Sequence, residues 1–176
     1  MNRNLYVLAG LVFAFAALFS VSRAAQIHVP ADFPGIQSAI NASANGDTII
    51  VAPGRYIENI DFLGKAITLR SIDPSDPATV AETIIDGNWS GSCVTFRSGE
   101  TESSVITGFT ITNGRAEYGG GIICDHASPV IEGNTIVGNQ AKGGGGVAFL
   151  ASSALINGCT VALNTGASFG GGRHPG

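Results

Sequence analysis

The sequence predicts an all-β fold: a right-handed parallel β-helix of about five to six coils, with about 25 residues in each coil. The main observation is a repeat. Three copies of the pattern aliphatic–Ile–X–Gly begin 25 residues apart, at Val105, Val130 and Leu155. Three threonines keep the same spacing: Thr110, Thr135 and Thr160. A fixed period between about 20 and 50 residues indicates a solenoid or another repeat array.

Each copy contains two or three short runs of β-branched residues, separated by glycine and asparagine, and no window long enough for a helix. This pattern excludes helical repeats, and the copies lack the regular leucine spacing of leucine-rich repeats. A parallel β-helix remains, with about three short strands per coil. Each strand is expected to pair with its equivalent in the next coil at roughly 4.8 Å.

The isoleucines indicate a bend within each coil. Ile106 and Ile111 are five residues apart, so an unbroken strand would put them on opposite faces. Both positions stay aliphatic in every copy, which predicts that both face the core. We place the bend at the glycine between them, Gly108, and at its equivalents in the other copies.

The 25-residue period also aligns two further sets of residues at equivalent positions of successive copies. One consists of residues that tolerate positive φ at low cost and therefore predicts a turn: Gly114, Asn139 and Asn164. The other consists of alternating pairs that follow glycine runs and predict stacked inward rows: Ile122 with Cys124, and Val147 with Phe149.

Residues 1–24 are predicted to be a signal peptide. A short polar start precedes an apolar run over residues 5–21, and the small residues Ser22 and Ala24 suit cleavage before Ala25. The alternative is an uncleaved anchor, because the apolar run is close to the minimum that spans a bilayer. In either case we expect the folded part to be secreted, periplasmic or on the cell surface, with no membrane contact after cleavage.

The mature part is acidic. Removing residues 1–24 leaves seven Lys and Arg side chains against thirteen Asp and Glu, and no basic cluster occurs anywhere. We therefore expect no nucleic-acid partner. Glycine accounts for 25 of 176 residues, about twice its average share, which fits tight coils better than helices.

Residues 25–46 are predicted to cap the first coil. A short strand leads into a segment in which Ile36, Ala39 and Ile40 have helical spacing. An open solenoid end exposes apolar side chains and strand edges, so an amphipathic helix over that end is expected. Residues 47–176 then form the β-helix itself.

Three segments carry a resemblance to a known family. They are Phe-Pro-Gly-Ile-Gln-Ser-Ala-Ile (33–40), Gly-Asp-Thr-Ile (46–49) and Gly-Arg-Tyr-Ile-Glu-Asn-Ile (54–60). Together they resemble the opening of the pectin lyase-like superfamily, and Gly-X-Tyr-X-Glu is similar to the first signature segment of pectin methylesterases. The later glycine-rich coils resemble the generic repeats of exported parallel β-helix proteins. The resemblance covers roughly residues 27–172 and implies the fold, which does not fix an activity.

The resemblance also implies polysaccharide chemistry, but the motifs that would carry catalysis are missing. Pectin methylesterases use paired aspartates and an arginine on later motifs that do not occur here, so Glu58 is expected to be structural. Pectate lyases imply calcium, which needs several converging oxygen ligands. One coil after Asp125 stands Leu150, and no ladder of acids runs through the repeats. We therefore predict no cofactor and no metal ligands, with calcium kept as the alternative.

Four side chains are candidates for substrate binding: Arg70, Asp86, Trp89 and Arg97. Trp89 is the only tryptophan and stands on a loop that begins at Asp86. Its ring can stack on a sugar or lie over the side of the solenoid as a hydrophobic cover, and we favour the cover. Arg70 and Arg97 follow strands and suit bidentate pairing with uronate carboxylates. An ordinary surface position is the simpler interpretation of both arginines.

Two pairs of residues are weaker candidates, and the catalytic residues are left unassigned. Asp73 and Asp76 lie in a proline-rich loop, which a solvated turn explains better than a metal site. Asp125 and His126 form an acid–base pair in sequence, but neighbours in sequence need not point together.

Three cysteines, Cys93, Cys124 and Cys159, are an odd number for an exported protein. Cys124 falls in a predicted inward row, where a thiol behaves as a small hydrophobe. No two of the cysteines are one coil apart, so we expect free thiols and no disulfide between coils. Their spacing also excludes a zinc site of the paired-cysteine kind.

The third copy runs into Phe169 and the glycine run 170–172 with no helix or polar strand that closes the tube. We favour a fragment of a longer β-helix; the alternative is a partner at an open C-terminal end, such as a second copy.

Three functions stay open. The one we favour is an exported β-helix module that presents a long, mostly neutral face to an extended polysaccharide. The second is a lyase or esterase on uronic-acid polymers whose catalytic coils are missing or diverged. The third is a structural or adhesive arm of a cell-surface protein. The first and second rest on the resemblance and not on a recognised site.

Overall fold

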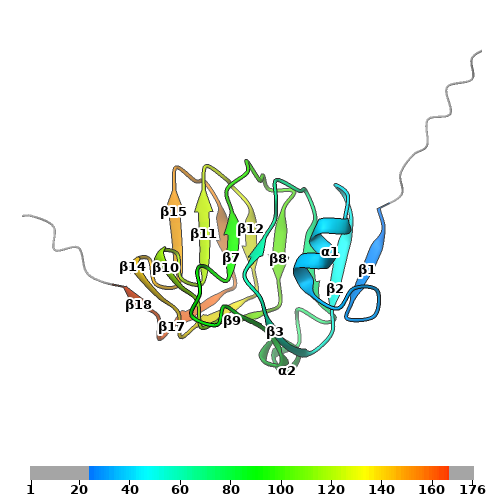
Figure 1. Cartoon of the computed structure of the whole chain (residues 1–176), viewed down its shortest axis with the longest axis horizontal. Helices are drawn as coiled ribbons and strands as arrows, with labels where there is room; N and C mark the ends of the chain where they lie inside the picture. The colour runs from blue at the N-terminus through cyan, green and yellow to red at the C-terminus, as the bar shows by residue number, and fades with distance from the viewer. Residues whose placement is uncertain (1–23, 167–176) are drawn as a thin grey trace, which may run out of the picture.

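The computed structural model describes residues 24–166, so the predicted signal peptide up to residue 23 and the last glycine run lie outside the described residues. In the described part, strands stack into four parallel sheets around one apolar core, and two short helices lie outside the coils (Figure 1). The predicted parallel β-helix is confirmed. Each complete coil of the repeat region has four strands, however, where three were predicted.

Sheets A and B contain most of the strands. Sheet A consists of β1 (Gln26–Val29), β2 (Thr48–Val51), β5 (Thr68–Ser71), β8 (Val105–Thr107), β12 (Val130–Glu132) and β16 (Leu155–Asn157), in this order. Sheet B consists of β3 (Gly54–Ile57), β6 (Thr83–Asp86), β9 (Thr110–Thr112), β13 (Thr135–Val137) and β17 (Thr160–Ala162). From β8 onward each residue of sheet A pairs with the residue 25 positions later.

Sheets C and D complete the coils. Sheet C consists of β4 (Ile60–Asp61), β7 (Val94–Phe96), β11 (Ile122–Asp125) and β15 (Val147–Leu150). Sheet D is the sheet that the sequence analysis missed: β10 (Arg115–Tyr118), β14 (Gln140–Gly143) and β18 (Thr165–Gly166). Its strands are mostly polar, and an apolar pattern marks only the strands of the other three sheets.

The predicted bend between sheets A and B is confirmed. Gly108, Gly133 and Gly158 have φ values of 82°, 58° and 59°, a region that favours glycine. Ile106 and Ile111, on either side of the first bend, are both fully buried. The bend therefore turns two positions of opposite parity toward one core.

The second predicted turn lies one residue earlier than expected. The residues with positive φ are Asn113, Gly138 and Leu163, not the row that contains Asn139. The Asn139 side chain points inward instead: its Oδ1 accepts from the Gly114 backbone N–H at 2.8 Å, and its Nδ2 donates to the Ile111 carbonyl at 2.9 Å. Asparagine is therefore present for its hydrogen bonds, since it satisfies backbone groups that the turn removes from the sheet.

The glycine runs form the tight passage from sheet D to sheet C. A Cβ atom on Gly121, within the first run, would lie 2.5 Å from the carbonyl oxygen of Gly146 in the next coil. A side chain at this position would therefore collide with backbone atoms, which explains why the runs recur in each coil.

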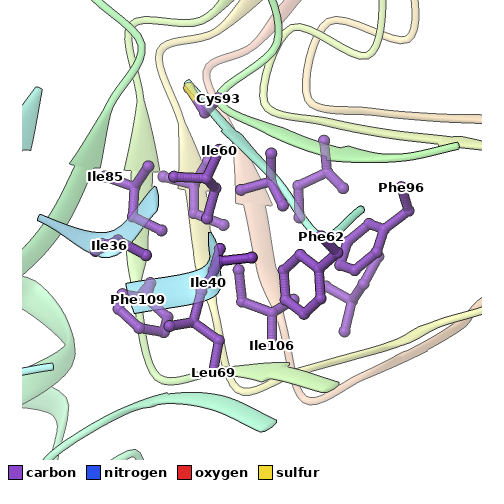
Figure 2. Packing of buried hydrophobic residues seen from close by; sticks show 14 of the residues in the cluster. Ile36, Ile40, Ile60, Phe62, Leu69, Ile85, Cys93, Phe96, Ile106 and Phe109 are labelled. Atoms are coloured by element: carbon purple, nitrogen blue, oxygen red, sulfur yellow. The ribbon is translucent and has the colours of Figure 1, made fainter. Parts of the chain in front are cut away.

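One hydrophobic cluster fills the tube. The tilted rings of Phe62 and Phe96 lie in contact, with centroids 4.3 Å apart, and Ile36 and Ile40 of the first helix belong to the same cluster (Figure 2). The predicted inward pair Ile122 and Cys124 is fully buried. The equivalent pair one coil later is less buried: Val147 is half-buried and Phe149 is 44% exposed, because no described strand covers β15 on its outer side.

The predicted N-terminal cap is confirmed in its helix. Helix α1 (Ile36–Ala42) covers the N-terminal end of the core and buries Ile36, Ala39 and Ile40 (Figure 1). The Glu58 carboxylate accepts from the backbone N–H groups of Ile36 and Gln37, at 2.9 and 2.8 Å. The expected structural role of Glu58 is thereby explained. Strand β1 is not separate from the solenoid, since it pairs with β2 as the first strand of sheet A.

A second helix, α2 (Pro77–Glu82), interrupts the coil between sheets A and B. The Asp76 carboxylate caps it, accepting from the backbone N–H of Thr79 at 3.0 Å and from the Thr79 hydroxyl at 2.7 Å. Asp73 accepts from Ser75 in the preceding turn. The proline-rich loop is therefore a helix start, and a capping aspartate followed by Pro at the first helical position is the sequence signal for it.

Candidate functional site

The four predicted substrate-binding residues do not form one site. Arg70 lies on β5 of sheet A, Asp86 at the end of β6 in sheet B, and Arg97 just after β7 of sheet C. Trp89 follows Asp86 in the loop that leads to sheet C. Only Asp86 and Trp89 are therefore neighbours in the fold.

Asp86 is occupied by contacts within the protein. Its carboxylate is buried and pairs with the Arg55 guanidinium, whose Nε lies 2.6 Å away. It also accepts from the Asn113 side chain at 3.1 Å and from the Asn88 backbone N–H at 2.8 Å. Burial alone would raise the pKa of Asp86, but these hydrogen bonds and the arginine charge together lower it.

Trp89 is half-exposed, at 52%. Its backbone N–H donates to the Asn113 carbonyl at 2.6 Å, and Gly91 in the same loop bridges to Arg115 of β10. The loop therefore lies against sheet D, in the place of a sheet D strand, and the indole is not a buried cover for the solenoid. Stacking of the Trp89 ring on a sugar stays a prediction.

The two arginines have local contacts. Arg70 donates through one guanidinium nitrogen to the backbone carbonyls of Ser71 and Ile72, at 2.9 and 3.0 Å. Arg97 is mostly exposed, and its Nε lies 3.9 Å from an Asp61 carboxylate oxygen. Neither arginine faces a concave surface formed by the other predicted site residues.

Asp125 and His126 do point together, with Asp125 Oδ1 and His126 Nδ1 2.6 Å apart, but both side chains are exposed. No serine or cysteine of the described residues donates to the imidazole. In residues 24–166 no three histidine, cysteine, aspartate or glutamate side chains come close enough together to hold a metal ion.

One concave site is lined by none of the candidate residues. A cavity of about 280 Å³, here called the threonine groove, lies between α2 and the outer face of sheet B. The α2 side of the groove is lined by Pro74, Ser75, Pro77, Val80 and Ala81. Its floor and opposite side are lined by Thr110, Thr135 and Thr160 with Gly133, Asn134 and Gly158.

The floor of the threonine groove is a ladder of hydroxyl groups. Thr110, Thr135 and Thr160 pair in register on β9, β13 and β17, so their side chains stand one above another at about the strand spacing of 4.8 Å. The Thr110 hydroxyl donates to the Val80 carbonyl at 2.9 Å and holds α2 against the sheet. The Thr135 and Thr160 hydroxyls have no hydrogen-bond partner in the described part of the chain, and no charged side chain lines the groove.

A second cavity, of about 260 Å³, lies on sheet D. Arg115, Gln140 and Thr165 occupy the same position in three successive coils and line it together with Lys142. Lys142 is already 3.5 Å from the Glu117 carboxylate. This surface is exposed and charged, in contrast to the neutral threonine groove.

The three cysteines are free thiols, as expected. Burial raises the pKa of Cys93 and of Cys124 to about 12, which keeps both sulfurs protonated at neutral pH. The Cys159 thiol, in the last described coil, is half-buried, and its pKa is raised mainly by burial as well. None of the three is activated as a nucleophile.

No helix of the described residues is long and apolar enough to cross a membrane. No protein-family model, curated protein sequence or solved structure matches the chain. The observed fold is compatible with the pectin lyase-like resemblance, while membership of that superfamily stays a prediction.

Proposed function

We propose that this chain is an exported polysaccharide-binding module that holds an extended, neutral glycan along the threonine groove. The observation that carries the proposal is the ladder of threonine hydroxyls that are aligned one coil apart in a groove free of charged side chains. A repeating polymer presents equivalent hydroxyl groups at regular intervals, so a repeating wall of hydroxyl groups suits such a ligand.

The wall opposite the ladder supports the same ligand class. Pro74, Pro77 and Val80 offer rigid apolar surface, while Thr135 and Thr160 offer donors and acceptors. Sugar rings combine apolar faces with hydroxyl edges, and a site with apolar contact plus a few placed polar groups is typical for such ligands.

The charge distribution favours a neutral glycan over an acidic one. The chain carries thirteen acidic and nine basic side chains, and none of them lines the threonine groove. A uronate polymer would find no cation there. Because the cavity, at about 280 Å³, lies just below the usual size range for ligand pockets, about 300–1,000 Å³, the groove should hold only a short stretch of the polymer and bind it weakly.

The experiment is affinity electrophoresis of the mature chain in gels that contain either a soluble neutral β-glucan or polygalacturonate. We expect retardation by the neutral glucan. The double variant Thr135→Val with Thr160→Val keeps the shape of both side chains and removes both hydroxyls. Its affinity should fall roughly five- to 150-fold, since two typical hydrogen bonds together contribute about 1–3 kcal/mol.

The matched control is Thr165→Val, an exposed threonine of sheet D outside the groove, which should bind as the unmodified chain does. Binding that is absent, or unchanged in the double variant, would contradict the proposal. Retardation by polygalacturonate that is lost in Arg70→Gln or Arg97→Gln would instead support the uronate site predicted from the sequence.

A further inference from the structure

We propose that the cavity on sheet D binds a tetrahedral oxyanion, the sulfate or phosphate group of a ligand, through the side chains of Arg115, Gln140 and Lys142. This cavity, called the sheet D cavity below, has a volume of about 260 Å³. It shares no lining residue with the threonine groove, so the inference does not depend on the function proposed above.

The two strands that carry these side chains are paired on both sides. Strand β10 pairs with β14, and β14 pairs with β18 (Figure 1). On its other side β10 is joined to the loop before β7, because Gly91 and Arg115 exchange two backbone hydrogen bonds of 2.8 Å. Arg115 pairs in register with Gln140, so the guanidinium and the amide belong to backbone positions about 4.8 Å apart. The donors are therefore held at one strand spacing on the side of the solenoid.

Arg115 differs from the other basic side chains of the described residues in its partners. No carboxylate or backbone carbonyl in residues 24–166 accepts a hydrogen bond from its guanidinium, although a guanidinium offers five N–H donors. The sequence also contains no aspartate or glutamate after Glu132. The other five described lysines and arginines all have partners: Arg55 with Asp86, Arg97 with Asp61, Lys142 with Glu117, and Lys65 and Arg70 with backbone carbonyls.

The number and the kinds of donor favour a tetrahedral oxyanion over a carboxylate. The cavity is lined by a planar guanidinium fork, an amide and an ammonium, which come from Arg115, Gln140 and Lys142. A carboxylate has two oxygens in one plane, whereas a sulfate or phosphate ester presents three oxygens that point in different directions. Arginine binds such groups bidentately, and lysine binds them as a point charge. Ala116 and Ala141 also line the cavity, and their small side chains leave room for the anion.

One carboxylate lies beside the sheet D cavity and opposes an anionic ligand. Glu117 Oε1 is 3.5 Å from the Lys142 ammonium, and the two side chains are 66% and 67% exposed. An ion pair at such exposure contributes little to stability. An incoming anion therefore competes with Glu117 for Lys142, while Arg115 has no such competitor. Removal of the Glu117 charge should consequently strengthen binding, and removal of the Arg115 charge should weaken it.

The test is a titration of the mature chain with sodium sulfate and with sodium phosphate, followed by the NMR signals of side-chain N–H groups. Sodium chloride keeps the ionic strength constant, because salt screens exposed charges. We expect saturable shifts of the Arg115 Nε and Gln140 Nε2 signals. Arg115→Gln should weaken the binding of both anions about ten- to 100-fold, the effect of one charge-assisted hydrogen bond. Glu117→Gln should strengthen it about two- to fivefold.

The matched control is Arg97→Gln, which removes the same charge from an exposed arginine beside Asp61 and should leave binding unchanged. Shifts that rise linearly with anion concentration would overturn the proposal, as would equal losses in Arg115→Gln and Arg97→Gln, because both results indicate general charge screening. Sodium acetate that binds as tightly as sulfate would overturn the choice of a tetrahedral anion.

Two further measurements identify the source of the anion and separate this site from the threonine groove. Dextran sulfate that displaces free sulfate, when unsubstituted dextran does not, would assign the anion to a polymer. Failure of dextran sulfate to displace it would assign the cavity to a free anion or a small ester, and either result supports the oxyanion site. Arg115→Gln should keep its retardation by the neutral β-glucan, so failure of one proposal leaves the other standing.

Discussion

The first and the last described coils of the solenoid are made of similar strands, but a helix covers the first coil and none of the described residues covers the last. At the N-terminal end, α1 covers the core, Glu58 binds its first N–H groups, and the Lys65 ammonium binds the last carbonyls of the helix. In the last described coil, Ile156 and Val161 point inward yet remain exposed. The comparison shows that position in the repeat sets the direction of a side chain, whereas its burial requires a neighbouring layer on both sides.

The largest expected effect comes from core truncation in equivalent coils. Ile131→Ala removes a fully buried side chain between two coils and should lower the free energy of unfolding by about 3–4 kcal/mol. Ile156→Ala makes the same change one coil later, where the side chain is partly exposed, and should cost about 1 kcal/mol. Urea unfolding at low protein concentration measures both. Equal losses would mean that the last coil is covered as well as its neighbour.

Asn139 and Asn164, at equivalent positions of the turn between sheets B and D, allow a second comparison between a covered coil and the last described coil. Asn139→Ala leaves the Gly114 N–H and the Ile111 carbonyl without partners in a buried turn and should cost about 2–3 kcal/mol. Asn164→Ala removes the equivalent, partly exposed side chain in the last described coil, where water can reach the freed groups, and should cost about 1 kcal/mol or less. Thermal unfolding of the two variants checks the difference. A larger loss of stability for Asn164→Ala than for Asn139→Ala would contradict the role given to the Asn139 hydrogen bonds.

Removing the charge of Glu58, which accepts hydrogen bonds from the first turn of α1, should lower the stability by an intermediate amount. Glu58→Gln keeps the size of the side chain but removes the charge and one of two acceptors, so the protein should lose about 1–2 kcal/mol. Glu102→Gln, at an exposed position outside any helix, is the matched control and should be neutral. Circular dichroism on heating measures both changes. A neutral Glu58→Gln would mean that the cap does not depend on this carboxylate.

Acid should loosen the N-terminal half first. Backbone N–H groups of Ala44 and Ala25 lower the pKa of Asp47, and the pKa values of Asp76 and Asp86 are also lowered. A carboxyl whose pKa is depressed in the folded state stabilises the protein above its usual pKa of 3.8, and this contribution disappears as the pH falls through the lower, folded-state value. Residues 133–166 contain no carboxylate side chain. Hydrogen exchange near pH 3 should therefore rise in residues 44–90 more than in 133–150, and the reverse order would contradict this assignment.

The smallest expected effect is a difference in reactivity among the three thiols of the native protein, and measuring it requires no change in stability. Cys159, half-buried in the last described coil, should react first with a disulfide reagent in the native protein. Cys93 and Cys124, both fully buried, should react only on unfolding. Timed labelling followed by mass spectrometry checks the order. Early labelling of Cys124 would show that the tube opens from a side and not from its end.

Much of this arrangement is predictable from the sequence, because the 25-residue spacing of Ile106, Ile131 and Ile156 fixes the register of the coils. Sheet D escaped prediction because its strands are polar and held mainly by backbone pairing. The threonine groove escaped because it requires an insertion, α2, to pack against residues 30–80 positions later in the chain. No single-sequence pattern specifies that packing. The 25-residue spacing of Thr110, Thr135 and Thr160 is evident in the sequence, but the segment that packs against these threonines is not.

The most direct test of the account is hydrogen exchange across all described coils. A closed N-terminal end predicts strong protection of α1 and β2. The last described coil has a described neighbouring coil on one side only, so β16, β17 and β18 should exchange faster than the equivalent strands β12, β13 and β14. Equal protection of the two sets of strands would contradict the account.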